Sequence, residues 1–243
     1  MDKLTLLLAT KGRDQFTIRF LAYANQISLK YPIYIADGEP KNDIKKIIKN
    51  KNFFPNISIS YNEFNDTSYL DYYNKIRVSL KSISTKYVMF IDNDDFIMPN
   101  GIEKCLDFLN QNDDYIGCSG RIGWFYTKKN LFDSNYISGK INYFFDKKGG
   151  YNPISYSNNL NSRMEQVSKK HTVTFYSVFD REKLYIASKE ICDMNFMFTY
   201  NFEFYFHIRM ISLGKIHAFK NTCSYLRQLG TSLGNDQNEQ LLG

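Results

Sequence analysis

Three aspartates stand within four positions near the middle of the chain, directly after a strand-like apolar run. Asp92, Asp94 and Asp95 follow Tyr87–Ile91, whose apolar and β-favouring residues are typical of a strand covered by helices on both faces. Carboxylates this close repel one another unless a cation lies among them. Oxygen ligands suit Mg²⁺ or Mn²⁺, which bind one or two carboxylates and take their other ligands from water and substrate phosphates. The spacing therefore predicts a divalent cation beside a phosphate-bearing substrate.

The same aspartates allow other interpretations. They could form only a solvated turn and a helix cap, because Pro99 and Asn100 open a predicted helix over 101–110. That alternative stays open, although the buried strand before the aspartates favours a site. An EF-hand loop is excluded, because Phe96 and Ile97 occupy the positions where it needs an oxygen ligand and a glycine.

The aspartates follow the last of four predicted strands. These strands cover 4–9, 32–36, 57–61 and 87–91. Helical spacing of apolar residues lies between them, over 14–29, 42–49 and 69–83. The alternation indicates a parallel, doubly wound α/β sheet, whose right-handed crossovers need those helices. Thr10–Arg13, Asp37 and the aspartates then share the sheet edge where ligands bind. Neither a G-x-G-x-x-G nor a P-loop motif is present. The phosphates of a ligand would therefore have to be bound by other groups, and a metal ion could bind them.

The second half of the chain is less regular. Short strands are predicted over 115–120 and 173–179, and Asp180 is placed to cap a helix over 181–188. A helix over 200–213 and short strands over 216–219 and 224–226 follow. Between 121 and 170 the periodicity fails, so irregular strands and loops are expected there, with aromatic side chains that either pack or stack on sugar rings.

Length and composition narrow the class of protein. The 243 residues suit one α/β domain, and four widely spaced cysteines without a CxxC pair argue against a zinc site or a disulfide framework. No apolar run could span a membrane and the first residues do not form a signal peptide, so a cytoplasmic protein is expected. No nucleic-acid-binding motif accompanies the net charge of +6, so no nucleic-acid partner is expected. Four lysines form either a solvated helix face or a surface for phosphates or for peripheral association with the inner face of a membrane: Lys45, Lys46, Lys49 and Lys51.

Four stretches, in this order, resemble the family 2 glycosyltransferases, which have the GT-A fold. They are LLLATKGRD at 6–14, YIADGEPKND at 34–43, NKIRVSLKSISTKYVMFIDNDDFIMPNG at 74–101 and FEFYFHIRMISLG at 202–214. The last departs from the family pattern, since Phe202 and Glu203 stand where Glu and Asp are usual. The resemblance covers almost the whole chain and implies a single GT-A domain over 1–243. Its nucleotide-sugar-binding half would be 1–120, and its acceptor-binding half, with the catalytic base, 121–243.

The resemblance also implies roles for residues on the donor side. Asp92 would contact the ribose or the metal, and Asp94 would bind a Mn²⁺ or Mg²⁺ ion that bridges the diphosphate, whereas Asp95 would at most cap the next helix. His217 would complete the metal shell or contact the diphosphate, unless it is structural. Asp37 would read the base, unless it only forms a turn before Gly38. The remaining nucleotide-sugar-binding residues are Thr10, Lys11, Gly12, Arg13, Arg77, Asn93 and Arg227, the last of which could also be an ordinary surface arginine.

Family 2 enzymes invert the anomeric centre in one displacement, so they need a general base and no protein nucleophile. The resemblance makes Glu203 the candidate base. Its aromatic neighbours are expected to desolvate it and raise its pKa: Phe202, Phe204, Tyr205 and Phe206. A surface glutamate paired with His207 is the alternative.

The sequence thus predicts a metal-dependent, inverting glycosyltransferase that moves a sugar from a nucleotide-sugar donor, expected to be a UDP-sugar, to a glycan or lipid-linked acceptor. A sugar-nucleotide nucleotidyltransferase is one alternative, but Thr10–Arg13 holds a single glycine where such enzymes carry a glycine-rich basic loop. A catalytically inactive nucleotide- or glycan-binding module on the same scaffold is another, because of the departure at Phe202.

Overall fold

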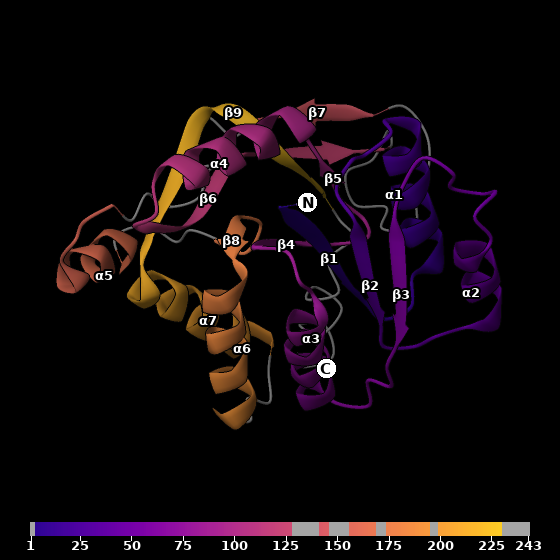
Figure 1. Ribbon diagram of the computed structural model, residues 1–243, viewed down its shortest axis with the longest axis horizontal. Helices are drawn as coiled ribbons and strands as arrows, with labels where there is room; N and C mark the ends of the chain where they lie inside the picture. Colours follow the sequence, from indigo (N-terminus) through magenta and orange to yellow (C-terminus); the bar gives the residue numbers. More distant parts are fainter. Residues whose placement is uncertain (1–2, 128–140, 146–155, 169–173, 195–198, 230–243) are drawn as a thin grey trace, which may run out of the picture.

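The computed structural model describes residues 3–127, 141–145, 156–168, 174–194 and 199–229, which fold around one mixed sheet (Figure 1). Its first half has the strand order β3-β2-β1-β4, and all neighbours in that half are parallel. These strands are β1 (Leu4–Thr10), β2 (Ile33–Asp37), β3 (Ile59–Glu63) and β4 (Tyr87–Ile91). The predicted parallel, doubly wound half is therefore confirmed.

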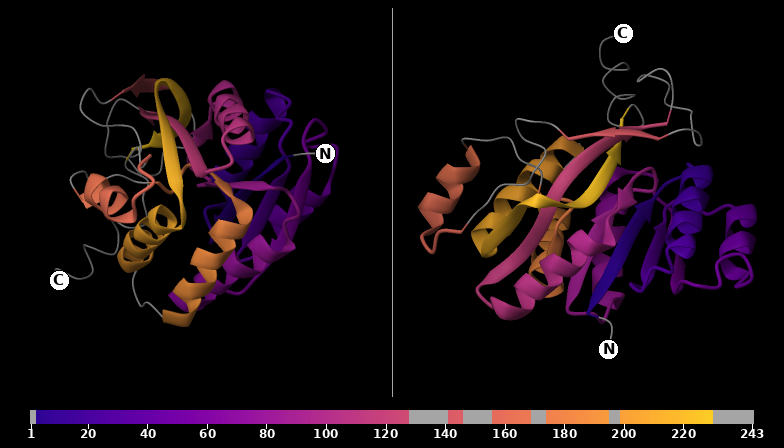
Figure 2. Two further views of the ribbon diagram at one scale, coloured as in Figure 1. Left: turned by 60° about the vertical axis from the view of Figure 1, so that its left-hand side comes forward. Right: turned by 90° about the horizontal axis from the view of Figure 1, so that it is seen from above.

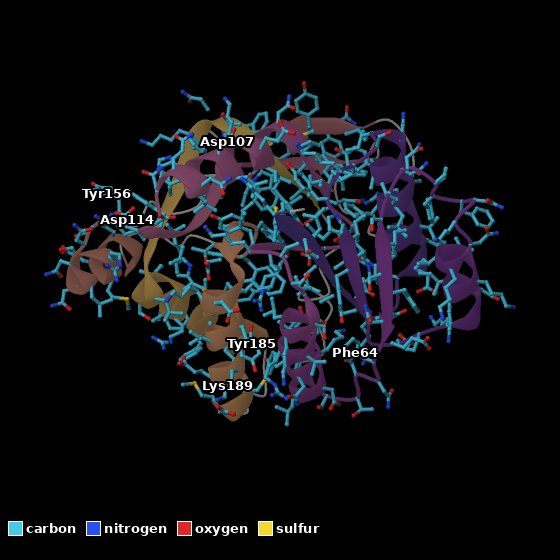
Figure 3. The ribbon with its side chains drawn as sticks, in the orientation of Figure 1. Phe64, Asp107, Asp114, Tyr156, Tyr185 and Lys189 are labelled. Carbon is cyan, nitrogen blue, oxygen red and sulfur yellow. The ribbon has the colours of Figure 1, made fainter. Side chains whose placement is uncertain are left out.

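Both faces of β1 and β4 are covered, which explains why their sequences are apolar throughout. Leu6 and Leu8 of β1 join one core cluster, whereas Leu7 joins a second cluster on the opposite face. The crossover helices are α1 (Asp14–Gln26), α2 (Asn42–Lys49) and α3 (Tyr69–Ser82). Figure 3 shows side chains filling the space between the sheet and the helices. Such two-sided burial excludes water from the central strands and supplies most of the stability of a fold of this kind.

The second half extends the sheet in the order β4-β8-β6-β9-β5, with β7 paired to β6. Its strands are β5 (Phe96–Ile97), β6 (Tyr115–Tyr126), β7 (Asn142–Phe144), β8 (Val178–Asp180) and β9 (Lys215–Gln228). Its helices are α4 (Pro99–Gln111), α5 (Leu160–Ser168), α6 (Arg181–Met194) and α7 (Thr199–Leu213). Figure 2 shows the long β6 and β9 running side by side. Within the described residues, none of the helices combines the length and apolarity needed to cross a membrane.

Several predicted element boundaries in this half were wrong. The strand expected over 115–120 continues to Tyr126, and the two short strands expected over 216–219 and 224–226 are one strand, β9. The cause is the parallel pairing of β6 with β9, which continues through register shifts and through the polar residues of β9. A Cβ on Gly120 would lie 2.5 Å from the carbonyl oxygen of Thr222, so this glycine permits the close approach of the two backbones. Helix α6 also continues to Met194, beyond the predicted end at 188.

The segment predicted as a strand over 173–179 is regular only from Val178. Within it, residues 174–177 form a turn that leads into β8. Asp180 caps the next helix as predicted, because its Oδ1 accepts a hydrogen bond of 3.0 Å from the backbone N–H of Lys183.

Two strand pairings bring distant segments to the carboxyl end of β4. The short β5 pairs antiparallel with β9, so Phe96 lies opposite Leu226 and Ile97 opposite Tyr225. Strand β8 pairs antiparallel with β4, with Val178 opposite Met89. The aspartate loop after β4, the end of β9 and the turn before β8 therefore meet at one place.

Candidate active site

The three aspartates converge after β4 as predicted. One carboxylate oxygen from each of Asp92, Asp94 and Asp95 lies within 4.8 Å of the others. Asp94 and Asp95 are buried and Asp92 is half-buried. Burial first and the charge of Asp94 next raise the pKa of both Asp92 and Asp95 above the usual aspartate range. A cation held among these oxygens would relieve that repulsion, so the cluster has the donor set that Mg²⁺ and Mn²⁺ prefer.

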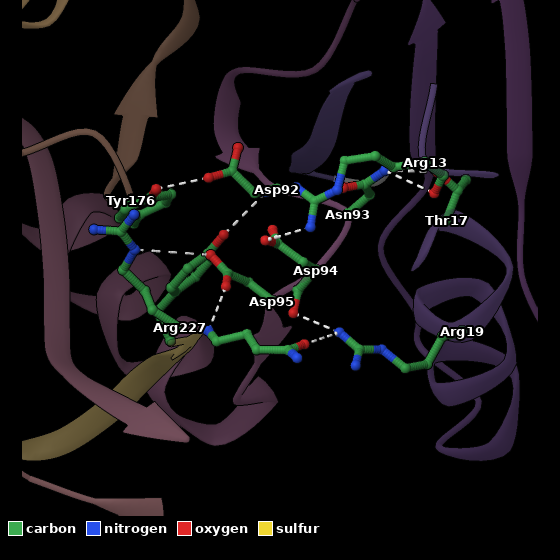
Figure 4. A network of polar contacts seen from close by, with 11 residues as sticks. Arg13, Thr17, Arg19, Asp92, Asn93, Asp94, Asp95, Tyr176 and Arg227 are labelled. Atoms are coloured by element: carbon green, nitrogen blue, oxygen red, sulfur yellow. Dashed lines mark hydrogen bonds and ion pairs between the residues drawn. The ribbon is translucent and has the colours of Figure 1, made fainter. Parts of the chain in front are cut away.

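Arginines surround the aspartates (Figure 4). An Nη2 of Arg13 lies 3.0 Å from Asp94 Oδ2. Arg19 donates to the carbonyl oxygen of Asp94 and, over 2.6 Å, to Gln228 Oε1. On the other side, Nε of Arg227 lies 3.9 Å from Asp95 Oδ2. The site therefore pairs a trio of carboxylates with guanidinium groups that could also bind phosphate oxygens.

The loop between β1 and α1 carries Arg13 to the aspartates. Gly12 and Arg13 both have left-handed backbone conformations, with φ of 64° and 59°. The side chain of Asn93 secures this loop, because its Nδ2 donates to the carbonyl oxygen of Arg13 (3.3 Å) and to Thr17 Oγ1 (3.1 Å). Asn93 is buried, and it connects the loop after β4 to the loop between β1 and α1. Lys11 is exposed beside them.

Asp95 does not cap α4, and the prediction that it would do so was wrong. The residue before α4 is Met98, and no side chain caps the helix there. Asp95 Oδ1 instead accepts a hydrogen bond of 2.7 Å from the backbone N–H of Gln228. The aspartate thus anchors the end of β9, and with it the neighbouring Arg227.

Asp37 lies at the end of β2 with both carboxylate oxygens engaged. Oδ1 accepts from the backbone N–H of Glu39 (3.0 Å) and Oδ2 from the hydroxyl of Tyr61 (2.6 Å). The contact with Glu39 is the turn interaction weighed above as the alternative role. Nearby, Lys75 forms a buried ion pair with Asp66 and donates to the carbonyl oxygen of Thr10 over 2.7 Å. Each oxygen of Asp37 keeps further acceptor capacity, so the turn and a ligand contact are compatible.

Glu203 lies on α7, and its charge interacts with the charges of Arg227 and Asp92. Its side chain is exposed, yet the surrounding protein desolvates it enough to raise its pKa; the charge of Arg227 opposes this and that of Asp92 adds to it. Of the aromatic neighbours expected to desolvate it, Phe204 is exposed and Phe206 packs edge-on against Phe90 in the core. Adjacent helix positions point in different directions, so these two side chains do not share the face of α7 that carries Glu203. The side chain of Phe202 lies outside the described residues.

His207 hydrogen-bonds to the turn before β8, and the described structure contains no pair between His207 and Glu203. Its Nδ1 lies 3.1 Å from Thr174 Oγ1. Burial lowers the pKa of His207 from 6.5 to about 4. The contact ties α7, which carries Glu203, to the turn before β8.

The low pKa of His207 predicts a loss of stability in mild acid. Between pH 6.5 and about 4 the unfolded chain takes up a proton that the folded histidine refuses, so the free energy of unfolding should fall as pH falls through this window. The loss attributable to this group is at most about 3 kcal/mol. Urea unfolding at a series of pH values should show it in the wild type and show less of it in His207→Asn. Parallel pH profiles for the two proteins would mean that the histidine is not buried in its neutral form.

Two predicted site residues are not brought to the aspartates. His217 lies on β9 opposite Cys118, and its ring stacks on Phe108 with centroids 4.3 Å apart. Phe108 belongs to the last turns of α4, whereas the aspartates precede the first turn of that helix. Arg77 lies on α3, where its Nη2 donates to Asn74 Oδ1 over 3.2 Å. The structure therefore gives no support to a metal or donor contact for either side chain.

The structure also adds residues that the sequence analysis missed. Tyr176 donates a hydrogen bond of 2.7 Å to Asp92 Oδ2, and Tyr225 accepts one of 3.0 Å from the backbone N–H of Asp92. Arg19 and Gln228 join the network as described above. No charge pattern or motif marks these residues in the sequence, since strand pairing over long separations brings them together.

Comparison with known proteins adds family and fold evidence. The model of the family described as glycosyl transferase family 2 matches residues 10–185, a range that contains the aspartates but ends before Glu203 and Arg227. Among curated proteins, none matches the chain.

Solved structures of TarS from S. aureus are similar in fold. TarS 1–349 in complex with UDP-GlcNAc has a TM-score of 0.59 and 11% identity, with 93% of this chain and 58% of that chain covered. TarS 1–349 alone has a TM-score of 0.57 and 12% identity, with 93% of this chain and 60% of that chain covered. TarS 1–349 in complex with UDP has a TM-score of 0.55 and 12% identity, with the same two shares covered. The likeness confirms the predicted GT-A fold, and the chain spans about 60% of the length of these TarS chains.

Proposed function

The chain belongs to glycosyl transferase family 2, and from that membership we propose that it transfers a sugar from a nucleotide-sugar donor to a glycan or lipid-linked acceptor, in a metal-dependent reaction that inverts the anomeric centre. The observation that carries the proposal is the trio of carboxylates within 4.8 Å at the carboxyl end of β4. Parallel sheets bind ligands at this edge. A UDP-sugar is the proposed donor, supported by the similarity in fold to TarS, whose structures hold UDP-GlcNAc and UDP.

On the donor side, Asp92 and Asp94 would hold Mg²⁺ or Mn²⁺, since their oxygens fit such an ion. When bound, the ion supplies positive charge where the departing diphosphate gathers negative charge. Arg13 and Arg227 lie on either side of the carboxylates and would bind phosphate oxygens. The Thr10–Arg13 loop and Asp37 would position the nucleoside, because they end the neighbouring strands β1 and β2.

On the acceptor side, Glu203 would act as the general base. It would take the proton of the acceptor hydroxyl while that oxygen attacks the anomeric carbon from the face opposite the diphosphate. A raised pKa makes this carboxylate a better proton acceptor than an ordinary surface glutamate. The displacement is direct, so no protein nucleophile is needed.

The test is release of UDP from a panel of UDP-sugars with Mn²⁺ or Mg²⁺, with and without EDTA. We expect release with at least one donor, loss of release in EDTA, and its return on addition of excess metal. Undiminished release in EDTA would contradict the metal requirement. Consumption of a nucleoside triphosphate with release of pyrophosphate would instead indicate a nucleotidyltransferase. Binding of UDP-sugars without release from any donor and acceptor tested would indicate an inactive binding module.

A further inference from the structure

Two stacked tyrosines hydrogen-bond Asp92, one at its side chain and the other at its backbone. The rings of Tyr176 and Tyr225 lie 4.2 Å apart at an angle of 21°. Tyr176 donates to the carboxylate of Asp92, and Tyr225 accepts from its backbone N–H. Both tyrosines are buried, with 5% and 0% of their surfaces exposed. Asp92 is therefore held through its side chain and its main chain by one aromatic unit.

The sheet explains how Tyr176 reaches this place. Val178 of β8 lies opposite Met89 of β4 in an antiparallel pair. The turn that holds Tyr176 comes directly before Val178, so it lies at the carboxyl end of β4, where Asp92 follows Ile91. The neighbouring Phe175 packs on β4, since its ring stacks on that of Phe90 with centroids 4.7 Å apart. The position of the phenol thus follows from the core of the fold and needs no ligand.

We propose that Tyr176 is a positioning residue for Asp92: its hydroxyl occupies one carboxylate oxygen and so presents the other to the donor's metal and diphosphate. This inference rests on the proposed function. Among the described residues, no side chain or backbone group hydrogen-bonds Asp92 Oδ1. A carboxylate with one oxygen occupied offers a single ligand atom in a fixed direction, which suits the strict octahedral geometry of Mg²⁺ and Mn²⁺ sites.

The ring of Tyr176 also supports the arginine on this side of the site. The guanidinium carbon of Arg227 lies 4.9 Å from the ring centroid of Tyr176 and 5.3 Å from that of Trp124. Figure 4 shows Tyr176 and Arg227 on the same side of the aspartates. Removal of the hydroxyl alone would leave this stacking in place. Tyr176→Phe therefore separates the hydrogen bond to Asp92 from the packing of the ring.

The test is calorimetric titration of the purified protein with UDP in the presence of Mn²⁺. We expect Tyr176→Phe to weaken binding about 10-fold to 100-fold, as is typical when the partner of a metal ligand is removed. In UDP release, kcat/KM should fall similarly, and raising the Mn²⁺ concentration should restore most of kcat. Unchanged affinity and an unchanged Mn²⁺ requirement would overturn the inference and leave Tyr176 a packing residue.

Two comparisons make the result specific. Tyr31 is also buried, and its hydroxyl has no hydrogen-bond partner in the described part of the chain, so Tyr31→Phe should bind as the wild type does. In the Asp92→Asn background, adding Tyr176→Phe should change the affinity less than about twofold if Tyr176 acts through Asp92. If the losses of affinity caused by the two substitutions simply add, Tyr176 does not act through Asp92. Wild-type protein that binds neither UDP nor Mn²⁺ would refute the proposed function itself, an outcome distinct from failure of the Tyr176 inference alone.

Discussion

Replacement of Asp94 by Asn is expected to lower UDP release from the preferred donor by at least about 10³-fold, with the fold intact. Asp94 is buried, offers one of the three clustered carboxylate oxygens, and forms the ion pair with Arg13. The amide keeps the shape of the side chain but cannot balance the charge of a divalent ion. Arg13 also loses the anion that holds it beside the site. Initial rates at saturating Mn²⁺, together with calorimetric Mn²⁺–UDP affinity, measure both effects.

Asp114→Asn is the matched control for Asp94→Asn. Asp114 is exposed and forms an ion pair with Lys215, and Figure 3 shows it well away from β1 and β2. Asp114 is a surface side chain outside the site, so this variant should keep the wild-type rate. Near-wild-type turnover by Asp94→Asn would exclude Asp94 as an essential ligand, and a metal role would then have to rest on Asp92 and Asp95.

The donor side of this site could be predicted from the sequence because it is built from local patterns. The apolar run Tyr87–Ile91 must be a central strand, and the carboxyl ends of parallel strands share an edge. The first strand places Thr10–Arg13 at that edge for the same reason, and the second places Asp37 there. None of these inferences requires knowledge of which distant segment pairs with which.

The other side of the site depends on pairings that local patterns do not encode. Arg227 reaches the aspartates because β5 pairs with β9, and β5 is only two residues long. Tyr176 reaches Asp92 through β8, a strand of three residues in a stretch that looks merely aromatic. Such short strands have almost no periodicity to detect.

The prediction for His217, to which the structure gives no support, depends on the same kind of pairing. When β9 is taken as two short strands, His217 lies near a strand end, where a ligand would be expected. In the structure it lies within a continuous strand, and its ring packs against Phe108 and Phe219. The ladder with β6 therefore decides between a site residue and a packing residue, and its length is not visible in the sequence of β9 alone.

Replacement of Glu203 by Gln is expected to lower kcat by about 10²-fold to 10⁴-fold and to leave the affinity for Mn²⁺–UDP unchanged. The amide keeps the size of the side chain but cannot accept the acceptor's proton. Partial desolvation, opposed by Arg227 and assisted by Asp92, raises the pKa of Glu203. The wild-type rate should therefore fall, as the pH is lowered, at a pH above that of an ordinary glutamate, because protonation removes the base.

The pH profile separates a base from a residue that only shapes the site. If Glu203 is the base, Glu203→Gln should lose the part of the acidic limb that is due to Glu203 as well as the rate, since the amide does not titrate, and only the limb due to Asp92 and Asp95 should remain. Glu103→Gln, on the outer face of α4 and paired with Lys30, is the matched control and should keep both. A lower rate with an unchanged acidic limb would mean that another group accepts the proton. Wild-type rates in Glu203→Gln would mean that Glu203 is an ordinary surface residue of α7 and that it is not the base.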